Sequence, residues 1–416
     1  MRNSIYIKKK ITLTNFAKKA LRTLRLSTFL LTGTVLFAQQ SVSLEKAIEL
    51  AKSNNIDLKI ANQEIEKQNV LKKAAFQPDA MQVQYQGGQF NSVDFDHNVS
   101  VQQFFPLGNS TKANRKWQEE LAKLAEKRKA LSEYEIEKAV TLAYYQYLYG
   151  VSIQKLNVEL NGIYTKFLKN AELRFKTGES GNIEVISAKA KVKEIETQRV
   201  QLEYDLAIYQ KQLQFFIQTN GDIIPDPNTA LQFAFIDTQE SSKAENLITA
   251  FYQQQISVYE KEAGTFKASR TPKVGLGYFT QTINTASLFQ GFTAGLQIPL
   301  FGSVNKAKAK AAEIGISQSQ LALDKNKLIL KLQREELQNN FKKQQSNLAY
   351  YQNEGLQYAD QIIATAQKSY ENGDMSYWTY ISFLNQAIDI KKQFAEATHS
   401  YNQSAIELQF PNIKNN

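Results

Sequence analysis

The sequence offers few side chains that could catalyse a reaction or bind a metal ion. Its 416 residues include no Cys, and the two histidines, His97 and His399, lie in different halves of the chain. A Ser-His-Asp hydrolase needs a histidine between a nucleophile and an acid, and a zinc site needs three or four His, Cys or carboxylate ligands. We recognise neither set, and no phosphate-binding loop. The sequence therefore predicts no enzyme, no metal site and no cofactor, and we interpret both histidines as ordinary polar residues.

Two short segments that end in glycine are more informative. Arg174-Phe175-Lys176-Thr177-Gly178 and Ser369-Tyr370-Glu371-Asn372-Gly373 each interrupt a long stretch without proline, and the second glycine follows the first by 195 residues. Glycine readily adopts the positive φ at which many helices end. We predict that each segment is the turn between two long helices, and that the chain contains an internal repeat.

The prolines support this repeat. Pro78 and Pro106 enclose a short segment of alternating polarity, Pro272 and Pro299 enclose another, and the offsets are 194 and 193 residues. We expect a β-hairpin in each segment and one long helical pair after it. The predicted parts of the chain are two repeats at about 39–220 and 240–410, hairpins at about 80–105 and 273–299, and an irregular linker at about 218–241 that forms a belt on the helices.

The remaining residues of each repeat show helical periodicity. In the first, Tyr149, Ile153, Leu156, Leu160, Ile163 and Phe167 recur at spacings of four and three, which is typical of a coiled coil. The second repeat has Leu348, Tyr351, Gly355, Tyr358 and Ile362 at matching positions. The predicted helices cover residues 44–76 with a break near 53–55, 110–175, 183–216, 242–267, 303–370 and a last helix that ends near 410. A helix from 110 to 175 would be ~100 Å long, far longer than a small globular domain.

Between Met81 and Phe105 the period changes to two, with Val99 and Val101 alternating with Asn98, Ser100 and Gln102. We find no apolar run after the N-terminal region that is long enough for a transmembrane helix. If this chain enters a membrane, it must use strands. Four strands leave two open edges, and each unpaired backbone group costs several kcal/mol in lipid. We therefore expect the edges to close against other copies.

The N-terminal region predicts export. Residues 1–38 carry eight Lys and Arg and no acid, and they end in an apolar run from Leu26 to Ala38. This pattern is typical of a signal peptide, and we expect cleavage after Ala38. The rest of the chain has 42 basic against 40 acidic residues, so its charge is nearly balanced. The composition gives no support for binding to nucleic acid.

Over nearly its whole mature length the sequence resembles the TolC family of outer membrane efflux proteins. The resemblance is carried by the duplicated order of helix, hairpin, long helix and return helix, by the two glycine turns, and by Phe105-Pro106-Leu107-Gly108 and Ile298-Pro299-Leu300-Phe301-Gly302 before the long helices. It implies a fold that is mainly α with β, in which long coiled-coil helices form an α-barrel and four strands per chain contribute to a trimeric 12-stranded β-barrel. The implied partners are two further copies, outer membrane lipid, a periplasmic adaptor and an inner-membrane pump of the RND or ABC type. Cargo would pass without a catalytic step.

The resemblance also implies roles for individual residues. Adaptor contact is expected at the turns, which comprise Arg174, Phe175, Thr177, Gly178, Glu179, Ser180, Tyr370, Asn372, Gly373, Asp374 and Met375. The entrance constriction is expected at Glu184, Tyr377, Thr379 and Ser382. Some members close the mouth with a ring of aspartates, but Thr379 and Ser382 are uncharged. Tyr377, Trp378 and Tyr380 crowd this place, where they could either narrow the bore or pack between helices.

Two other classes of protein share some of these features. A periplasmic coiled-coil adaptor or structural protein would also be exported and helical, but adaptors usually have one helical hairpin and compact β-domains, whereas this chain has two matched helical pairs. A secreted enzyme would need a constellation of polar residues, and we find none.

Overall fold

Long helices make up most of the chain. The structure, a computed structural model, describes residues 40–219, 221–236, 241–283, 287–299 and 302–413, so the predicted signal peptide lies outside the described residues. The helices are α2 (Leu44–Asn54), α3 (Ile56–Leu71), a 3₁₀ turn (Lys72–Ala75), α4 (Ser110–Lys176), α5 (Asn182–Ile217), α6 (Ser241–Ala268), α7 (Ser303–Tyr350), a π-turn (Tyr351–Gly355), α8 (Leu356–Glu371) and α9 (Tyr377–Gln409). The helix expected over 303–370 is therefore interrupted by a π-turn that its periodicity did not predict.

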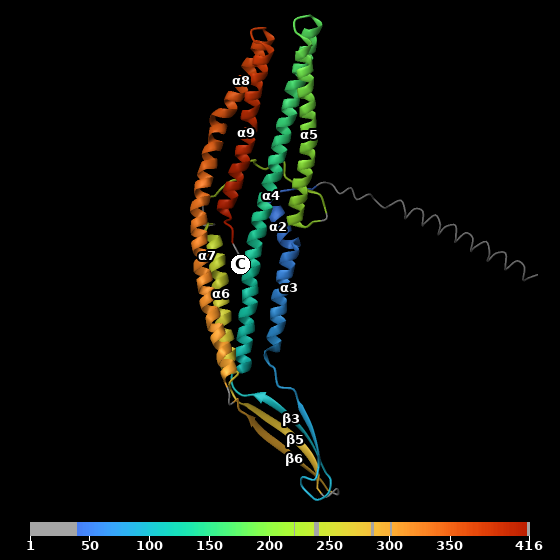
Figure 1. The fold of residues 1–416 in the computed structure, drawn as a ribbon, viewed down its shortest axis with the longest axis vertical. Helices are drawn as coiled ribbons and strands as arrows, with labels where there is room; N and C mark the ends of the chain where they lie inside the picture. The colour runs from blue at the N-terminus through green and yellow to red at the C-terminus, as the bar shows by residue number, and fades with distance from the viewer. Residues whose placement is uncertain (1–39, 220, 237–240, 284–286, 300–301, 414–416) are drawn as a thin grey trace, which may run out of the picture. The chain divides into compact units, whose positions relative to one another are not determined.

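Two helical segments run the length of the helical part, one formed by α4 and the other by α7, the π-turn and α8 in succession, and shorter helices pack on each of them (Figure 1). Along α4, helix α3 covers the part near the strands and α5 covers the part towards the first glycine turn. The N–H of Ile56, which begins α3, donates to Oε1 of Gln218 at 2.7 Å, so α5 ends where α3 begins. In the second repeat α6 packs on α7, and α9 packs on α8 and α7. Among the described helices, none combines the length and the apolar character that crossing a membrane requires.

The buried face of the long helices differs in part from the predicted heptad pattern. Leu160 and Phe167 are buried as expected, but Tyr164 is buried and Ile163 only half-buried. Tyr358, expected inside, is 47% exposed. The reason is that one residue turns a helix by about 100°, so an error of one position moves a side chain well off the packed face. Towards the glycine turns the buried positions include Leu160, Tyr164, Phe167 and Ala171 in α4, and Gly355, Ala359, Ala366 and Tyr370 at the end of the π-turn and in α8.

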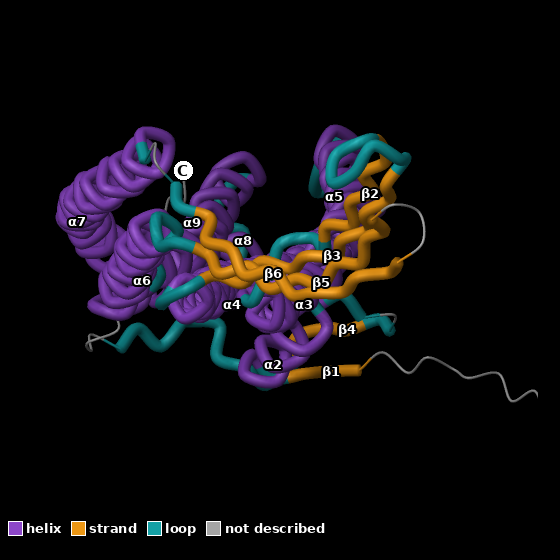
Figure 2. Tube along the Cα trace, turned by 90° about the horizontal axis from the view of Figure 1, so that it is seen from below, coloured by secondary structure: helices purple, strands orange, loops and turns teal. Residues whose placement is uncertain are grey.

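Four antiparallel strands form one sheet at the end of the helices away from the glycine turns (Figures 1 and 2). The strands are β2 (Gln82–Gly88), β3 (Asp96–Pro106), β5 (Lys273–Ile283) and β6 (Ser287–Gln297), in the order β2-β3-β5-β6. Because consecutive side chains point to opposite faces, the register sorts residues by polarity. One row across the sheet reads Val83, Val101, Tyr278, Phe292, and the neighbouring row reads Gln82, Gln102, Gly277, Thr293. Along these two rows the sheet therefore has an apolar face and a polar face, and Phe104 and Phe279 lie on the same face as Gln102 and Gly277.

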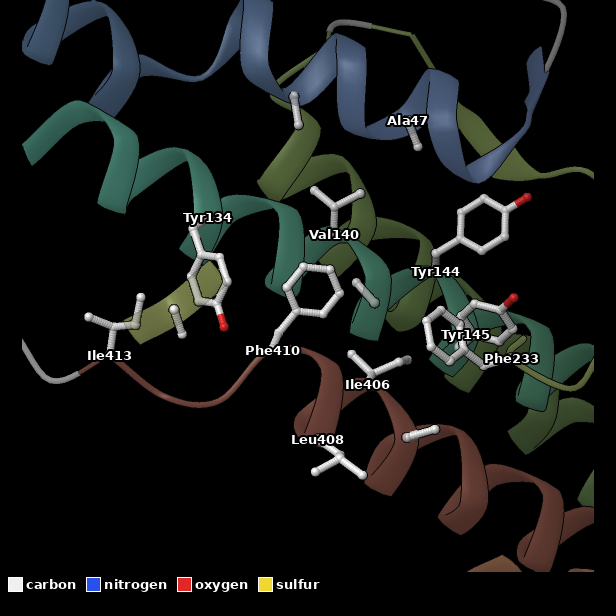
Figure 3. Packing of buried hydrophobic residues seen from close by; sticks show 14 of the residues in the cluster. Ala47, Tyr134, Val140, Tyr144, Tyr145, Phe233, Ile406, Leu408, Phe410 and Ile413 are labelled. Atoms are coloured by element: carbon white, nitrogen blue, oxygen red, sulfur yellow. The ribbon is translucent and has the colours of Figure 1, made fainter. Parts of the chain in front are cut away.

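The main hydrophobic core surrounds α4, on which α2 and α9 pack (Figure 3), and it extends to residues of α5, α6 and α7. Tyr144, fully buried, donates to the carbonyl oxygen of Val42 at 3.0 Å. The linker packs on the same core through Phe233, whose N–H donates to Oδ1 of Asn402 at 2.8 Å. Within the linker β4 (Ile223–Pro225) pairs with β1 (Gln40–Val42). The segment joining the two repeats is therefore held by backbone pairing with β1, by the side chain of Asn402 on α9 and by apolar contacts with the helices.

Candidate functional site

The two glycine turns have the same backbone structure. Gly178 has φ of +79° and Gly373 has φ of +84°. After α4 the N–H of Gly178 donates to the carbonyl oxygen of Phe175 at 3.1 Å, and that of Glu179 to Arg174 at 2.8 Å; after α8 the distances at the equivalent positions are 3.1 and 2.9 Å. This pair of bonds is the Schellman arrangement, which satisfies the last carbonyl groups of a helix and needs a positive φ at its centre. The chain therefore presents two matched tips, at 174–180 and 369–375.

Most of the residues predicted to contact an adaptor lie on the surface of these tips. Thr177 donates through its hydroxyl to the carbonyl oxygen of Arg174 at 3.1 Å and to Oε1 of Glu179 at 3.0 Å, so the first tip is braced by its own side chains. Tyr370 is the exception, since it is 4% exposed. The exposed residues are Phe175, Thr177, Gly178, Glu179, Asn372, Gly373 and Asp374, and the half-buried ones are Arg174, Ser180 and Met375.

A cluster of aromatic rings lies beneath the tips and joins three helices. The ring of Phe167, from α4, lies 5.7 Å from that of Tyr370 in α8, and 5.4 and 5.5 Å from those of Tyr377 and Tyr380 in α9. Tyr370 and Tyr380 stack at 4.8 Å. Burial raises the pKa of Tyr380 to about 12, so its hydroxyl is neutral at any ordinary pH. This aromatic cluster fixes the first helical hairpin against the second.

A polar bridge at the edge of the cluster joins the two tips. The hydroxyl of Tyr370 donates to Oε2 of Glu184 at 3.3 Å, and Cζ of Arg174 lies 4.9 Å from the centre of the Tyr370 ring. Burial raises the pKa of Tyr370, the negative charge of Glu184 adds to the increase, and Arg174 opposes it. The hydroxyl therefore stays protonated and remains a donor to the carboxylate. Residues from α4, α5 and α8 meet in this bridge.

A second polar contact between the hairpins, a pair of salt bridges, lies further from the tips. Nζ of Lys391, on α9, lies 2.6 Å from Oε1 of Glu159 on α4 and 2.9 Å from Oδ1 of Asp360 on α8. Burial acts to lower the pKa of Lys391, but its hydrogen bonds to the two carboxylates outweigh burial and raise the pKa. The lysine is therefore charged and bridges three helices.

The residues predicted to form the entrance constriction have different surroundings. Tyr377 is buried in the aromatic cluster, where it packs between helices. Thr379 and Ser382 are exposed, and Thr379 is part of the cap of α9, since its N–H donates to Oγ of Ser376 at 3.2 Å. Glu184 is half-buried and bonded to Tyr370. Of the aromatic residues expected to crowd this place, Tyr377 and Tyr380 are packed inside and Trp378 is 63% exposed.

Phe175 was predicted to contact an adaptor, but two other exposed apolar residues near the first tip, Leu173 and Ile183, were not identified from the sequence. Leu173 is 62% exposed, Ile183 57% and Phe175 45%, although large apolar side chains are usually buried. Contiguous exposed apolar surface commonly marks a contact with another protein. The signal was present in the sequence, because these residues stand next to the glycine turn but off the packed face of their helices.

Phe167 gives a direct test of the aromatic cluster. Phe167→Ala removes a ring that is 3% exposed and contacts three tyrosines, so we expect the free energy of unfolding to fall by about 3–5 kcal/mol. Phe175→Ala is the matched control on the same helix; its ring is 45% exposed, and the expected loss is within about 0.5 kcal/mol. Denaturant unfolding of the two purified variants measures the difference. Equal losses would show that the rings do not join the hairpins.

The two histidines lie far from the tips. Nδ1 of His97, in β3, is 2.9 Å from the hydroxyl of Tyr85, and the ring of His399, in α9, stacks on Tyr149 with 4.4 Å between the centres. Burial lowers the pKa of His399. In the described ranges, no three His, Cys, Asp or Glu side chains come together to hold a metal ion.

Comparison with known proteins gives structural matches only. No family model matches the sequence, and no curated protein does. A crystal structure of a membrane protein from Pseudomonas aeruginosa matches with a TM-score of 0.71 and 14% identity, over 88% of this chain and 92% of that chain. The outer-membrane channel OprN matches with 0.70 and 14%, over 88% and 89%. The outer membrane protein VceC from Vibrio cholerae matches with 0.67 and 13%, over 88% and 94%. At such identities a likeness speaks for the fold, and it extends over most of the chain: this protein has the fold of outer membrane channels.

Proposed function

We propose that this protein is an outer membrane exit duct of the TolC family. It would serve a tripartite efflux or type I secretion system as a passive conduit, through which an inner-membrane pump delivers cargo by way of a periplasmic adaptor. The observation that carries the proposal is the arrangement of the chain: a sheet with an apolar and a polar face at one end, two matched helical tips at the other, and long helices between them. The fold shared with solved outer membrane channels supports it.

The sheet would form the membrane part of the duct. Its row Val83, Val101, Tyr278, Phe292 would face lipid, and the row Gln82, Gln102, Gly277, Thr293 would face water. Alternation of this kind is typical of strands in outer-membrane barrels. The helices would extend the bore into the periplasm, with the tips at its far end.

The tips would contact the adaptor. Their Schellman turns project the glycines into open space, since nothing lies within 4 Å of a Cβ atom built on Gly178 or Gly373. Exposed apolar residues surround the first tip, and the aromatic cluster gives the pair a rigid base. We propose that both tips are seated in matching pockets of the adaptor.

The mature protein is expected to form a stable trimer. Four strands have two open edges, and unpaired edge groups cost several kcal/mol each in lipid, so a folded monomer should not persist there. Chemical cross-linking of the detergent-extracted protein, followed by mass analysis, measures the oligomer. Monomers or dimers as the largest species would contradict the proposal.

Cell fractionation distinguishes the proposed duct from the other classes of protein. A heat-modifiable oligomer in the outer membrane supports the duct. A soluble monomer in the periplasm would instead favour a coiled-coil adaptor, a structural protein or a secreted enzyme, because none of these needs strands in lipid.

A further inference from the structure

The two outer edges of the sheet are related by the internal repeat to strands that already pair within the chain. β2 and β6 are the outer strands of the order β2-β3-β5-β6, and in the described part of the chain neither pairs on its outer side. In the repeat, β3 corresponds to β6, and β5 corresponds to β2. The contact between β3 and β5, which joins the two hairpins, is therefore a template for a contact between β6 of one copy and β2 of the next.

The offset between the two hairpins is 193 residues. Residues 105–107 (Phe-Pro-Leu) match 298–300 (Ile-Pro-Leu) at this offset, and Tyr85 matches Tyr278. The pairing inside each hairpin agrees: the paired residue numbers add up to 184 in the first hairpin, where Val83 faces Val101, and to 570 in the second. The difference of 386 is twice 193. The offset is therefore a property of both the sequence and the sheet.

Applying this offset to the central contact fixes a register. Every pair between β3 and β5 has residue numbers that add up to 379, as in Val101 with Tyr278. Moving β3 forward by 193 residues and β5 back by 193 leaves this sum unchanged. We infer that β6 of each copy pairs antiparallel with β2 of the next copy in the register whose residue numbers also add up to 379, so that Ala294 lies opposite Tyr85 of the next copy.

The geometry of closure supports this register. A row that starts at Val83 crosses Val101, Tyr278 and Phe292, and in the inferred register it reaches Gly87 of the next copy, four residues further along β2. Three copies then give a stagger of 12 residues in a ring of 12 strands. With a rise of ~3.3 Å per residue and strands ~4.8 Å apart, this stagger means a tilt of ~35°. Barrel strands tilt by about 35–45°.

Neighbouring registers fit less well. A slip by one residue would place the apolar face of β6 beside the polar face of β2. A slip by two residues in one direction halves the stagger and gives a tilt of ~19°, well below the usual tilt, whereas in the other direction it gives ~46°, at the upper end of the usual range, so that the tilt alone does not exclude this register. Neither slipped register reproduces the contact that the chain already makes between β3 and β5. The inferred register alone meets all three conditions.

This inference rests on the proposed duct, because it needs copies that close a ring, but it can be tested separately. The chain has no Cys, so pairs of introduced cysteines report directly on contacts. Tyr85→Cys is combined with Ala294→Cys for the inferred register, and with Phe292→Cys or Leu296→Cys for the two slipped ones. All four side chains lie on the apolar face and are exposed in the single chain. Val101→Cys with Tyr278→Cys is the control for the same pairing within one chain.

The full-length variants are oxidised in outer membranes with copper phenanthroline and analysed on denaturing gels without reductant. We expect Tyr85→Cys with Ala294→Cys to give covalent dimers and trimers. The slipped pairs should give at least about fivefold less, because diagonal neighbours are about 7–8 Å apart and a disulfide needs Cβ atoms about 3.5–4.5 Å apart.

Two results would overturn the inference, and they can be told apart by whether the proposed duct also fails. If trimers form but a slipped pair cross-links best, the register is wrong and the duct stands. If native mass analysis of the variants and of the unmodified protein finds no oligomer, the proposed duct fails and the inference fails with it.

Discussion

Valine in place of Gly373, or of Gly178, is expected to abolish export while trimers remain in the outer membrane. Both glycines have φ near +80°, which a β-branched residue reaches only at a cost of about 1–3 kcal/mol. No side chain lies within 4 Å of the added Cβ, so the strain is confined to the turn. A cost of this size is small beside the packing of a whole trimer, but it would change the surface that we propose is seated on the adaptor.

The glycine that directly follows the first tip provides a control. Gly181 has φ of −83° and ψ of 156°, a conformation that valine adopts without strain, and the nearest atom to its Cβ position is Cγ2 of Ile183 at 3.8 Å. Gly181→Val should therefore export normally. Trimer abundance and cargo export are measured in the same cells. If Gly178→Val and Gly373→Val export normally at normal abundance, these turns only terminate their helices. The proposal that they contact the adaptor would then be wrong.

Val101→Arg is expected to prevent assembly almost completely. Val101 stands in the middle of the apolar row, between Val83 and Tyr278, and an arginine that faces lipid at the bilayer midplane costs about 2–4 kcal/mol. Three copies carry the substitution, so the cost is met three times in one trimer. We expect the yield of trimer in the outer membrane to fall sharply.

Gln102→Arg is the matched control, one residue along the same strand. Gln102 lies in the polar row between Gln82 and Gly277, where an arginine would be hydrated. Its trimer yield should be close to normal. Similar yields from the two variants would mean that the faces are assigned wrongly or that the sheet does not lie in the membrane.

The ends of the helices could be predicted because local chemistry sets them. Serine is among the residues that favour the N-terminal cap of a helix, and the side chain of Ser43 accepts from the N–H of Lys46 at 3.3 Å. The turns at Gly178 and Gly373 follow from the conformation that glycine permits. Strand polarity was equally accessible, because alternation is a property of neighbouring residues.

Contacts between distant residues could not be predicted in the same way. Tyr370 and Glu184 are 186 residues apart in the chain, and nothing local indicates that they are bonded. The position of Tyr377 also depends on Phe167, which belongs to the other hairpin. Spacings of four and three are compatible with more than one helix face, so the pattern could not choose between Ile163 and Tyr164.

The spacing of the buried residues bears on how the helices run past one another. At the end of the π-turn and in α8, eleven residues separate Gly355 from Ala366 and Ala359 from Tyr370, whereas the buried residues of α4 repeat every seven, from Leu160 to Phe167 and from Tyr164 to Ala171. A heptad falls about 20° short of two whole turns and winds helices into a left-handed supercoil, whereas eleven residues overshoot three turns by about the same angle. Near the tips α4 therefore keeps the spacing of a left-handed supercoil, whereas the spacing in α8 is that of a helix that runs nearly straight or slightly right-handed past its neighbour. Helices that do not wrap around one another lie side by side. A small rotation of each helix about its own axis would then change the width of the opening of the proposed duct.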